Sequence, residues 1–250
     1  MKPKVLLLGA TGRIGPSLIS EYKKEYSDKY ELIIGIHNKN LEYNLPTKKI
    51  DLLDLKSLEE AFAGIDVVIN LAANANEKEE DFTKFVNPNI IGAYNVFEAA
   101  RKANCKRVIF ASSVHVIKGY PIDYEVHPKD NPLPLNFYAA TKVFGEALCN
   151  VFSSKYNLSC LAIRVGAYVT NDLLNKVCFE RETYHYVITQ RDFAELIYKS
   201  IIAENKIKFG ILAGISNNKK RNMDLEHTKQ LINYEPKDEV FDICEKIKSN

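Results

Sequence analysis

Short apolar runs alternate with longer stretches of helical periodicity along most of this chain. The runs are rich in Val, Ile and Leu, which is typical of strands buried on both faces of a parallel sheet. We expect strands at Val5–Leu8, Leu32–Ile36, Val67–Leu71, Arg107–Ala111 and Cys160–Val165, with a further one before Asp51. The helical stretches cover residues 14–26, 56–63, 83–103 and 136–156. This alternation predicts an α/β fold: a doubly wound parallel sheet of the Rossmann type, with right-handed crossovers.

The later part of the chain predicts a helix near 191–203, a strand near 207–213 and a helix near 224–233. Two long stretches, 114–135 and 166–189, follow strand ends and break the rhythm. Ligand-binding loops lie at such places in this architecture. We therefore expect one domain over residues 1–250, with substrate-lid segments near 166–189 and 213–250.

Two local signals mark the starts of helices. Pro16 suits the first turn of the first helix, where a missing N–H costs nothing. Ser57 and Glu60 have the spacing of a capping box for the second helix. Asp54 is an alternative cap for that helix.

Composition excludes several classes of protein. Of the 250 residues, 46% are hydrophobic and 26% charged, as in an ordinary globular protein. The 34 basic and 32 acidic residues are well mixed, so we expect no nucleic-acid partner. No apolar run reaches the roughly 18–20 residues that span a bilayer. The first predicted strand begins near Lys4, so we expect no targeting peptide, no membrane association and a cytoplasmic location.

The five cysteines are odd in number and contain no Cys-x-x-Cys pair. We expect them to be reduced packing residues, as in most cytoplasmic proteins. The spacing of a zinc site is absent from the sequence, and we expect no metal.

A glycine-rich turn follows the first predicted strand and opens the first helix: Gly9-Ala10-Thr11-Gly12-Arg13-Ile14-Gly15. Such glycines allow a tight turn, close approach of the backbone to a pyrophosphate, and tight packing of helix on strand. The helix N-terminus then faces the phosphates. The position of the motif, directly after a strand, predicts a dinucleotide site.

The end of the second strand bears on the choice of cofactor. NAD-binding proteins favour an acid there, and this chain has His37, Asn38 and Lys39 instead. Lys39 and Arg13 are suited to pair with the 2′-phosphate of NADP; alternatively both are solvated surface cations. We therefore expect NADP or NAD, with NADP slightly favoured.

Other cofactor contacts are expected at the ends of later strands. Asp51 is placed to accept a hydrogen bond from the adenine amino group. Small residues after the fourth strand leave space beside the cofactor. For Asn89 a structural role is more probable than direct chemistry. The remaining expected cofactor contacts are Leu52, Leu71, Ala72, Ala73, Asn89, Tyr138, Val165 and Lys142, the last through the nicotinamide ribose.

The strongest chemical signal is Tyr138 with Lys142 and Ser113. The tyrosine and lysine are four residues apart on one predicted helix, so their side chains share a face. A phenol has a pKa near 10, which a nearby ammonium and a positive cofactor ring lower. Tyr138 would then take the proton of a substrate hydroxyl while hydride leaves the same carbon. The Ser113 hydroxyl would hold the reacting oxygen, with Ser112 as the alternative.

These motifs together resemble the extended short-chain dehydrogenase/reductase family, also described as NAD-dependent epimerases/dehydratases. The likeness covers nearly the whole chain. Within the family the chain is most similar to uronate dehydrogenases and archaeal sugar dehydrogenases. The stretches that carry this likeness are 89–101, Phe110–His115, Val143–Glu146 and Pro236–Asp238. The resemblance implies oxidation of a monosaccharide at its anomeric carbon to a lactone, with Ser113 and His115 contacting the sugar.

The chain departs from the uronate dehydrogenases at sugar-contacting positions. It has Val114 where they have Asn, and Ala75 where they have Ser. Their arginine for the substrate carboxylate falls in a loop where this chain offers Arg181 or Lys176. Uronate itself is therefore in doubt as the substrate.

Three readings of the function stay open at this point. The leading one is a dehydrogenase or reductase for a small sugar-like alcohol or carbonyl. The alternatives are a nucleotide-sugar epimerase, dehydratase or reductase, and a non-catalytic NAD(P)-sensing protein. The helices 83–103 and 136–156 carry apolar residues on more than one face, among them Val86, Ile90, Tyr94 and Phe97. We expect them to pair across a homodimer.

Overall fold

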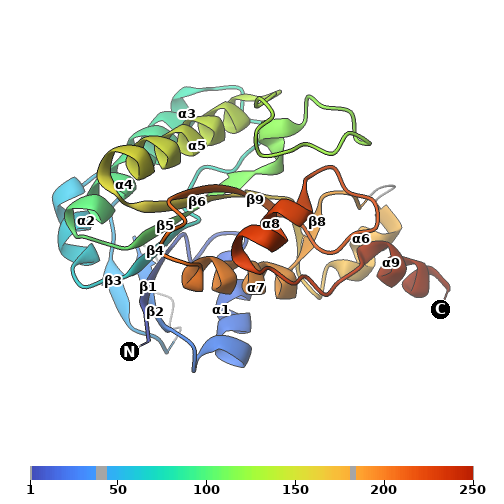
Figure 1. The fold of residues 1–250 in the computed structure, drawn as a ribbon, viewed down its shortest axis with the longest axis horizontal. Helices are drawn as coiled ribbons and strands as arrows, with labels where there is room; N and C mark the ends of the chain where they lie inside the picture. The colour runs from blue at the N-terminus through green and yellow to red at the C-terminus, as the bar shows by residue number, and fades with distance from the viewer. Residues whose placement is uncertain (1, 38–43, 181–183, 250) are drawn as a thin grey trace.

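A seven-stranded parallel sheet forms the centre of the computed structural model, which describes residues 2–37, 44–180 and 184–249 (Figure 1). Its order is β3-β2-β1-β4-β5-β6-β9, and each neighbouring pair is parallel. The strands are β1 (Lys4–Leu8), β2 (Glu31–Ile36), β3 (Thr47–Lys49), β4 (Val67–Asn70), β5 (Arg107–Ser113), β6 (Ser159–Val165) and β9 (Phe209–Gly214). The order reverses between β1 and β4, which creates a crevice at the carboxyl edge of the sheet.

Helices cover both faces of the sheet (Figure 1). One face carries α2 (Leu55–Phe62), α3 (Thr83–Phe85), α4 (Gly92–Lys102) and α5 (Phe137–Tyr156). The other carries α1 (Gly15–Glu21) and α7 (Gln190–Ile202), with α8 (Leu225–Ile232) next to β9. The predicted Rossmann-type fold is therefore confirmed. The predicted helices 14–26 and 83–103 each contain a π-helical turn, at Tyr22–Tyr26 and Val86–Ile91.

The side chains of β1 explain why the sheet needs helices on both faces. Val5 and Leu7 join one buried cluster, with side chains of α1 and α7. Leu6 and Leu8 join a second cluster, with side chains of α2, α4 and α5. Successive side chains of a strand point to opposite faces, so a run of four apolar residues contributes side chains to the buried clusters on both faces of the sheet.

Local signals at the helix starts are partly as expected. Pro16 lies in the first turn of α1. The proposed capping box of Ser57 and Glu60 is wrong, because α2 begins earlier. Asp54 is its N-cap, and the Asp54 carboxylate accepts from the Ser57 N–H at 3.1 Å.

The segment after β6 builds a small second unit. It contains the two-stranded parallel sheet of β7 (Ala167–Val169) and β8 (Val187–Thr189), the helix α6 (Leu174–Glu180) and, later, α9 (Val240–Ser249). Six buried residues form its separate cluster: Val169, Cys178, Tyr184, Val187, Val240 and Cys244. These elements fall within the predicted lid segments; their role as a substrate lid stays a prediction.

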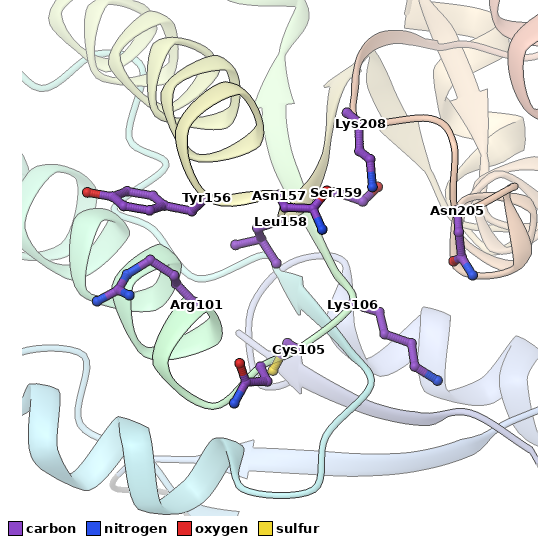
Figure 2. Close-up of a pocket in the computed structure, with 10 residues that line it drawn as sticks. Arg101, Cys105, Lys106, Tyr156, Asn157, Leu158, Ser159, Asn205 and Lys208 are labelled. Atoms are coloured by element: carbon purple, nitrogen blue, oxygen red, sulfur yellow. The ribbon is translucent and has the colours of Figure 1, made fainter.

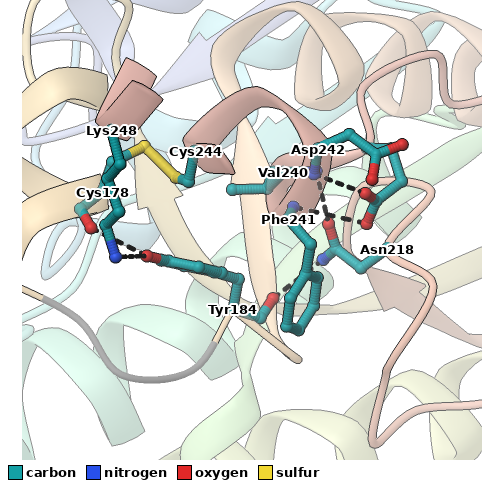
Figure 3. The surroundings of a disulfide bond; sticks show 9 residues. Cys178, Tyr184, Asn218, Val240, Phe241, Asp242, Cys244 and Lys248 are labelled. Atoms are coloured by element: carbon teal, nitrogen blue, oxygen red, sulfur yellow. Dashed lines mark hydrogen bonds between the residues drawn. A yellow bond between two sulfur atoms is a disulfide. The ribbon is translucent and has the colours of Figure 1, made fainter. Parts of the chain in front are cut away.

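A disulfide joins Cys178 of α6 to Cys244 of α9 (Figure 3). The expectation that every cysteine is a reduced packing residue is therefore wrong for this pair. The two residues are 66 positions apart, and only the tertiary fold brings their sulfurs together. Cys105, Cys149 and Cys160 are free and buried, as expected.

Candidate active site

Two adjoining cavities follow the carboxyl edge of the sheet. One has a volume of about 430 Å³ and contains Tyr138 and Lys142. The other has a volume of about 390 Å³ and contains His37 and Asp51. Both are lined by Gly9, Gly12, Leu71 and Ala73, so the glycine-rich turn lies between them.

Two glycines of the turn, Gly9 and Gly15, leave no room for a side chain. Gly9 has φ +81°, a left-handed conformation that favours glycine. A Cβ atom there would lie 2.7 Å from the backbone nitrogen of Ala72. At Gly15 a Cβ would lie 2.2 Å from the carbonyl oxygen of Ala10. These close approaches fit the predicted roles of the glycines in dinucleotide binding.

The second cavity has the position of an adenosine site. Thr11, Leu52, Leu71, Ala72 and Ala73 line it with His37 and Asp51, as expected. One Asp51 oxygen accepts from the Leu53 N–H at 2.9 Å, and the other lies 3.9 Å from His37 Nε2. Asn38 and Lys39 fall outside the described residues. Arg13 and Ile14 line the first cavity instead, together with Val165.

Ser113, Tyr138 and Lys142 meet in the first cavity. Ser113 is the last residue of β5, while the other two lie in the first turns of α5. Lys142 is buried, and its Nζ donates to the carbonyl oxygen of Ala111 at 2.8 Å. The Nζ lies 5.6 Å from the centre of the Tyr138 ring. Tyr138 and Lys142 therefore lie on the same face of α5, as their spacing predicted, and Ser113 reaches the cavity from the carboxyl end of β5.

Of the two adjacent serines, Ser113 is the one whose hydroxyl contacts Tyr138. The Ser112 hydroxyl donates to Glu146 at 2.6 Å, inside the protein. The Ser113 oxygen accepts from the His115 N–H at 3.2 Å, and the serine also bonds to Tyr138. This arrangement favours Ser113 over the alternative.

Burial controls the ionisation of the tyrosine and lysine. It raises the pKa of Tyr138, against the lowering effects of the Ser113 hydrogen bond and the Arg13 charge. It also lowers the pKa of Lys142 to about 8. The protein's own groups therefore do not lower the Tyr138 pKa, because desolvation outweighs the neighbouring charges; the expected lowering also includes the positive ring of a bound cofactor.

Asn89 has the structural role that was expected. It is buried, and its amide nitrogen donates to the Asn74 carbonyl and to the Thr141 hydroxyl, at 2.9 Å each. Its amide oxygen accepts from the Asn74 N–H at 2.8 Å. Asn89 therefore ties the loop after β4 to the helix of Tyr138.

The predicted substrate side of the cavity contains Ala75, Val114 and His115, as expected. Arg181 lies outside the described residues. Four lining residues with polar side chains were not predicted from the sequence: Glu77, Lys118, Tyr168 and Tyr186. The last three lie in the two long stretches after strand ends, and Glu77 follows the end of β4. Applying the strand-end rule to every loop would have found all four.

A third hollow, of about 320 Å³, lies at the opposite edge of the sheet (Figure 2). Its lining residues lie at the amino ends of β5, β6 and β9 and in the segments just before them. Arg101 there is paired with Glu98, and Lys106 with Asp66. Burial raises the pKa of Cys105 to about 12, so its thiol is unreactive at neutral pH. The hollow therefore lacks the chemistry of the carboxyl edge.

In the described parts of the chain, no helix is both long enough and apolar enough to cross a bilayer.

The model of the NAD dependent epimerase/dehydratase family matches residues 5–172. The chain belongs to this family. The match covers the glycine-rich turn, β1 to β7 and the helix of Tyr138 and Lys142.

Individual relatives are sugar dehydrogenases by name. L-arabinose 1-dehydrogenase (NAD(P)(+)) of Haloferax volcanii is 29% identical, over 97% of this chain and 99% of the relative. Uronate dehydrogenase of Pseudomonas putida is 28% identical, over 94% of this chain and 84% of the relative. The solved uronate dehydrogenase from Agrobacterium tumefaciens superposes with a TM-score of 0.81 at 25% identity, covering 100% of this chain and 90% of that one. The predicted class, an NAD(P)-dependent dehydrogenase of the extended short-chain type, is confirmed.

Proposed function

We propose that this protein oxidises the anomeric carbon of a small sugar to a lactone, using NAD or NADP. The main support is the meeting of Ser113, Tyr138 and Lys142 in a cavity that adjoins the glycine-rich turn. A cavity of about 430 Å³ suits a monosaccharide beside the reactive end of the cofactor. The names of the relatives favour the same substrate class.

In this proposal each residue handles one part of the reaction. The Ser113 hydroxyl holds the anomeric oxygen, and Tyr138 accepts its proton. When bound, the oxidised nicotinamide accepts the hydride from the anomeric carbon. Lys142 supplies a positive charge that favours the phenolate, provided that it is protonated; a pKa of about 8 leaves it so at neutral pH.

The glycine-rich turn and the cavity of His37 and Asp51 fit the remainder of the dinucleotide. Gly9 and Gly12 leave the backbone open to a pyrophosphate at the N-terminus of α1. Asp51 would accept from the adenine amino group. Leu52, Leu71, Ala72, Ala73 and Val165 would contact the cofactor through apolar surface.

We propose that both cofactors serve, with NADP slightly preferred. The described end of β2 is Ile36 followed by the exposed His37, with no acid to repel a 2′-phosphate. Arg13 and Lys39 are the cations that would bind it. The two roles of Arg13 separate in one experiment. If Arg13→Ala loses affinity for NADP but not for NAD, then Arg13 binds the 2′-phosphate. If the affinities for NADP and NAD fall equally, then Arg13 binds the pyrophosphate that both cofactors share.

The substrate proposal is tested by titrating the protein with both cofactors and assaying aldoses, uronates and sugar phosphates at 340 nm. Tyr138→Phe should abolish turnover and keep cofactor affinity. Tyr156→Phe, an exposed tyrosine at the other end of α5, is the matched control. Tight cofactor binding without turnover of any sugar would overturn the proposal. An epimerase would instead interconvert a nucleotide sugar without net reduction of the cofactor.

We also propose a homodimer through the outer face of α4 and α5. Ile91, Tyr94, Val151 and Tyr156 keep between 41% and 48% of their surface exposed. Exposed apolar side chains on two neighbouring helices favour an interface. Phe97, which we had counted toward this face, is buried in the core and does not contribute. Light scattering on the purified protein measures the mass directly.

A further inference from the structure

Glu77 enters the first cavity from the loop between β4 and α3. Its Oε2 atom lies 2.7 Å from Nε2 of His115. The glutamate side chain keeps 47% of its surface exposed and the histidine 14%. The pair therefore connects a surface loop with a ring that lies edge-on to Tyr138, at 5.9 Å between ring centres.

The second ring nitrogen of His115 has a partner as well. Nδ1 lies 3.3 Å from the amide nitrogen of Asn136. The orientation of that amide is set by its oxygen, which accepts from the Ala139 N–H at 2.8 Å. Because an amide nitrogen only donates, Nδ1 accepts, and the ring proton lies on Nε2 toward Glu77. Burial and the Lys118 charge lower the pKa of His115, which favours this neutral form over the charged one.

The same asparagine begins the helix of Tyr138. Asn136 is the N-cap of α5, in an extended conformation with φ −147° and ψ 166°. Caps of this kind determine where a helix starts and how its first turn is held. Tyr138 lies two residues later, within that first turn. A continuous set of hydrogen bonds thus runs from Glu77 through His115 and Asn136 to the start of the catalytic helix.

We propose that Glu77 is a positioning residue for Tyr138, acting through the His115 ring and the Asn136 cap. The proposal rests on the proposed function, in which Tyr138 takes the substrate proton. It also changes the expected role of His115. Both ring nitrogens are engaged within the protein, so the ring supports the tyrosine instead of binding the sugar.

Besides holding Tyr138 in position, Glu77 changes the pKa of Tyr138 through its negative charge. Several charged and polar groups face the phenol, from separate elements. Glu77 raises the pKa of Tyr138, whereas Ser113 and Arg13 lower it. The Nζ atom of Lys142 lies 5.6 Å from the centre of the Tyr138 ring, and neutral His115 lies edge-on to it. Removing the Glu77 charge while keeping its hydrogen bond should therefore lower the Tyr138 pKa.

Three variants separate these effects in the full-length protein. Glu77→Ala breaks the set of hydrogen bonds, and kcat should fall about tenfold with unchanged cofactor affinity, as expected for a displaced catalytic group. Glu77→Gln offers a carbonyl to the same N–H, so it should keep most of kcat. The acidic limb of its kcat/KM profile should move to lower pH, because the base loses a proton more readily. Glu80→Ala, an exposed acid of the same loop, should behave as wild type.

Imidazole ¹⁵N chemical shifts test the arrangement without any substrate. Wild type should show His115 protonated on Nε2, and Glu77→Ala should lose this single tautomer. If the wild type oxidises no sugar but shows the tautomer, the proposed function fails and the positioning contact stands. A His115 protonated on Nδ1 would overturn the inference. So would a Glu77→Ala variant that keeps wild-type kcat, whether or not the sugar KM rises; a raised KM alone would identify Glu77 as a sugar contact.

Discussion

Arg164 and Glu146 form a two-pronged ion pair between β6 and α5, inside the protein. Nε and Nη2 of the arginine donate to the two carboxylate oxygens, at 2.9 Å each. The two side chains keep only 4% and 6% of their surface exposed. Because α5 also carries Tyr138 and Lys142, the pair holds the catalytic helix against the sheet.

Breaking this pair should be costly. Arg164→Met leaves a buried carboxylate without its cation, and we expect a loss of about 3–5 kcal/mol in the free energy of unfolding. The double variant Arg164→Met with Glu146→Leu should lose less than Arg164→Met alone, because neither charge is then left unpaired. Urea denaturation of the single and double variants measures both values. A double variant as unstable as the sum of the two singles would contradict this account.

Replacing Lys142 should stabilise the protein while inactivating it. Its pKa in the folded protein is about 8, below the ordinary 10.5, so below pH 8 the fold carries a buried charge. A difference of this size corresponds to about 3 kcal/mol. Lys142→Met should therefore be more stable than wild type at pH 7 by up to about 3 kcal/mol.

The stability difference between Lys142→Met and wild type should depend on pH in a definite direction. Between pH 8 and 10.5 the unfolded chain binds the Lys142 proton and the folded protein does not, so wild-type stability rises with pH. The advantage of Lys142→Met should shrink across this window. Lys155→Met, at the exposed end of the same helix, is the control and should change stability by less than about 0.5 kcal/mol. An advantage that stays constant up to pH 10.5 would contradict the assignment.

Reduction of Cys178–Cys244 should make the unit of α6 and α9, which lines one side of the Tyr138 cavity, less rigid. The disulfide joins α6 to α9 across a cluster of only six buried residues. Around it, Asn218 donates to the Tyr184 carbonyl, and Lys248 donates to the Tyr184 hydroxyl (Figure 3). Asn218 also donates to the Val187 carbonyl. The same unit supplies Tyr168 and Tyr186 to the cavity.

We therefore expect a reducing agent to raise the sugar KM several-fold, with little change in cofactor affinity. The unit should also lose about 2–4 kcal/mol of stability, the usual contribution of a disulfide. A protein carrying both Cys178→Ser and Cys244→Ser should already show these changes and should not respond to the reductant. If that variant still responds, another group accounts for the effect.

Gly9→Ala should prevent cofactor binding. A methyl group there would lie 2.7 Å from the backbone of Ala72, at a backbone angle of φ +81°. Gly64 provides a matched control, because it also has positive φ, +73°, and a Cβ there meets nothing within 4 Å. Gly64→Ala should therefore cost only backbone strain, about 1 kcal/mol, and keep cofactor affinity. Equal cofactor affinities in the two variants, measured by fluorescence titration, would contradict the role of the turn.

Much of the cofactor half could be read from local sequence. The glycine-rich turn directly follows an apolar run, and the run and the turn together occupy residues 5–15. Tyr138 and Lys142 are one helical turn apart, so periodicity alone aligned them. The sequence left two candidates for the start of α2, because Asp54 and Ser57 both have side chains that cap helices. The hydrogen bond to Ser57 N–H settled it.

The substrate half could not be read in the same way. Glu77 and His115 are 38 positions apart in the chain, yet they make a 2.7 Å contact. No periodicity links residues in separate loops. The direction of the Tyr138 pKa also depended on burial, which is a property of the packed cavity and not of neighbouring residues.

By itself, then, the sequence determined the parallel α/β sheet, the position of the dinucleotide turn and the Tyr138–Lys142 pair. Each of these is indicated by a pattern of residues close together in the chain. Only the tertiary structure decided the Cys178–Cys244 disulfide, the Glu77–His115 contact and the lining of the cavity that contains Tyr138. These arise where loops from separate strands meet, because the sheet brings distant segments to one edge.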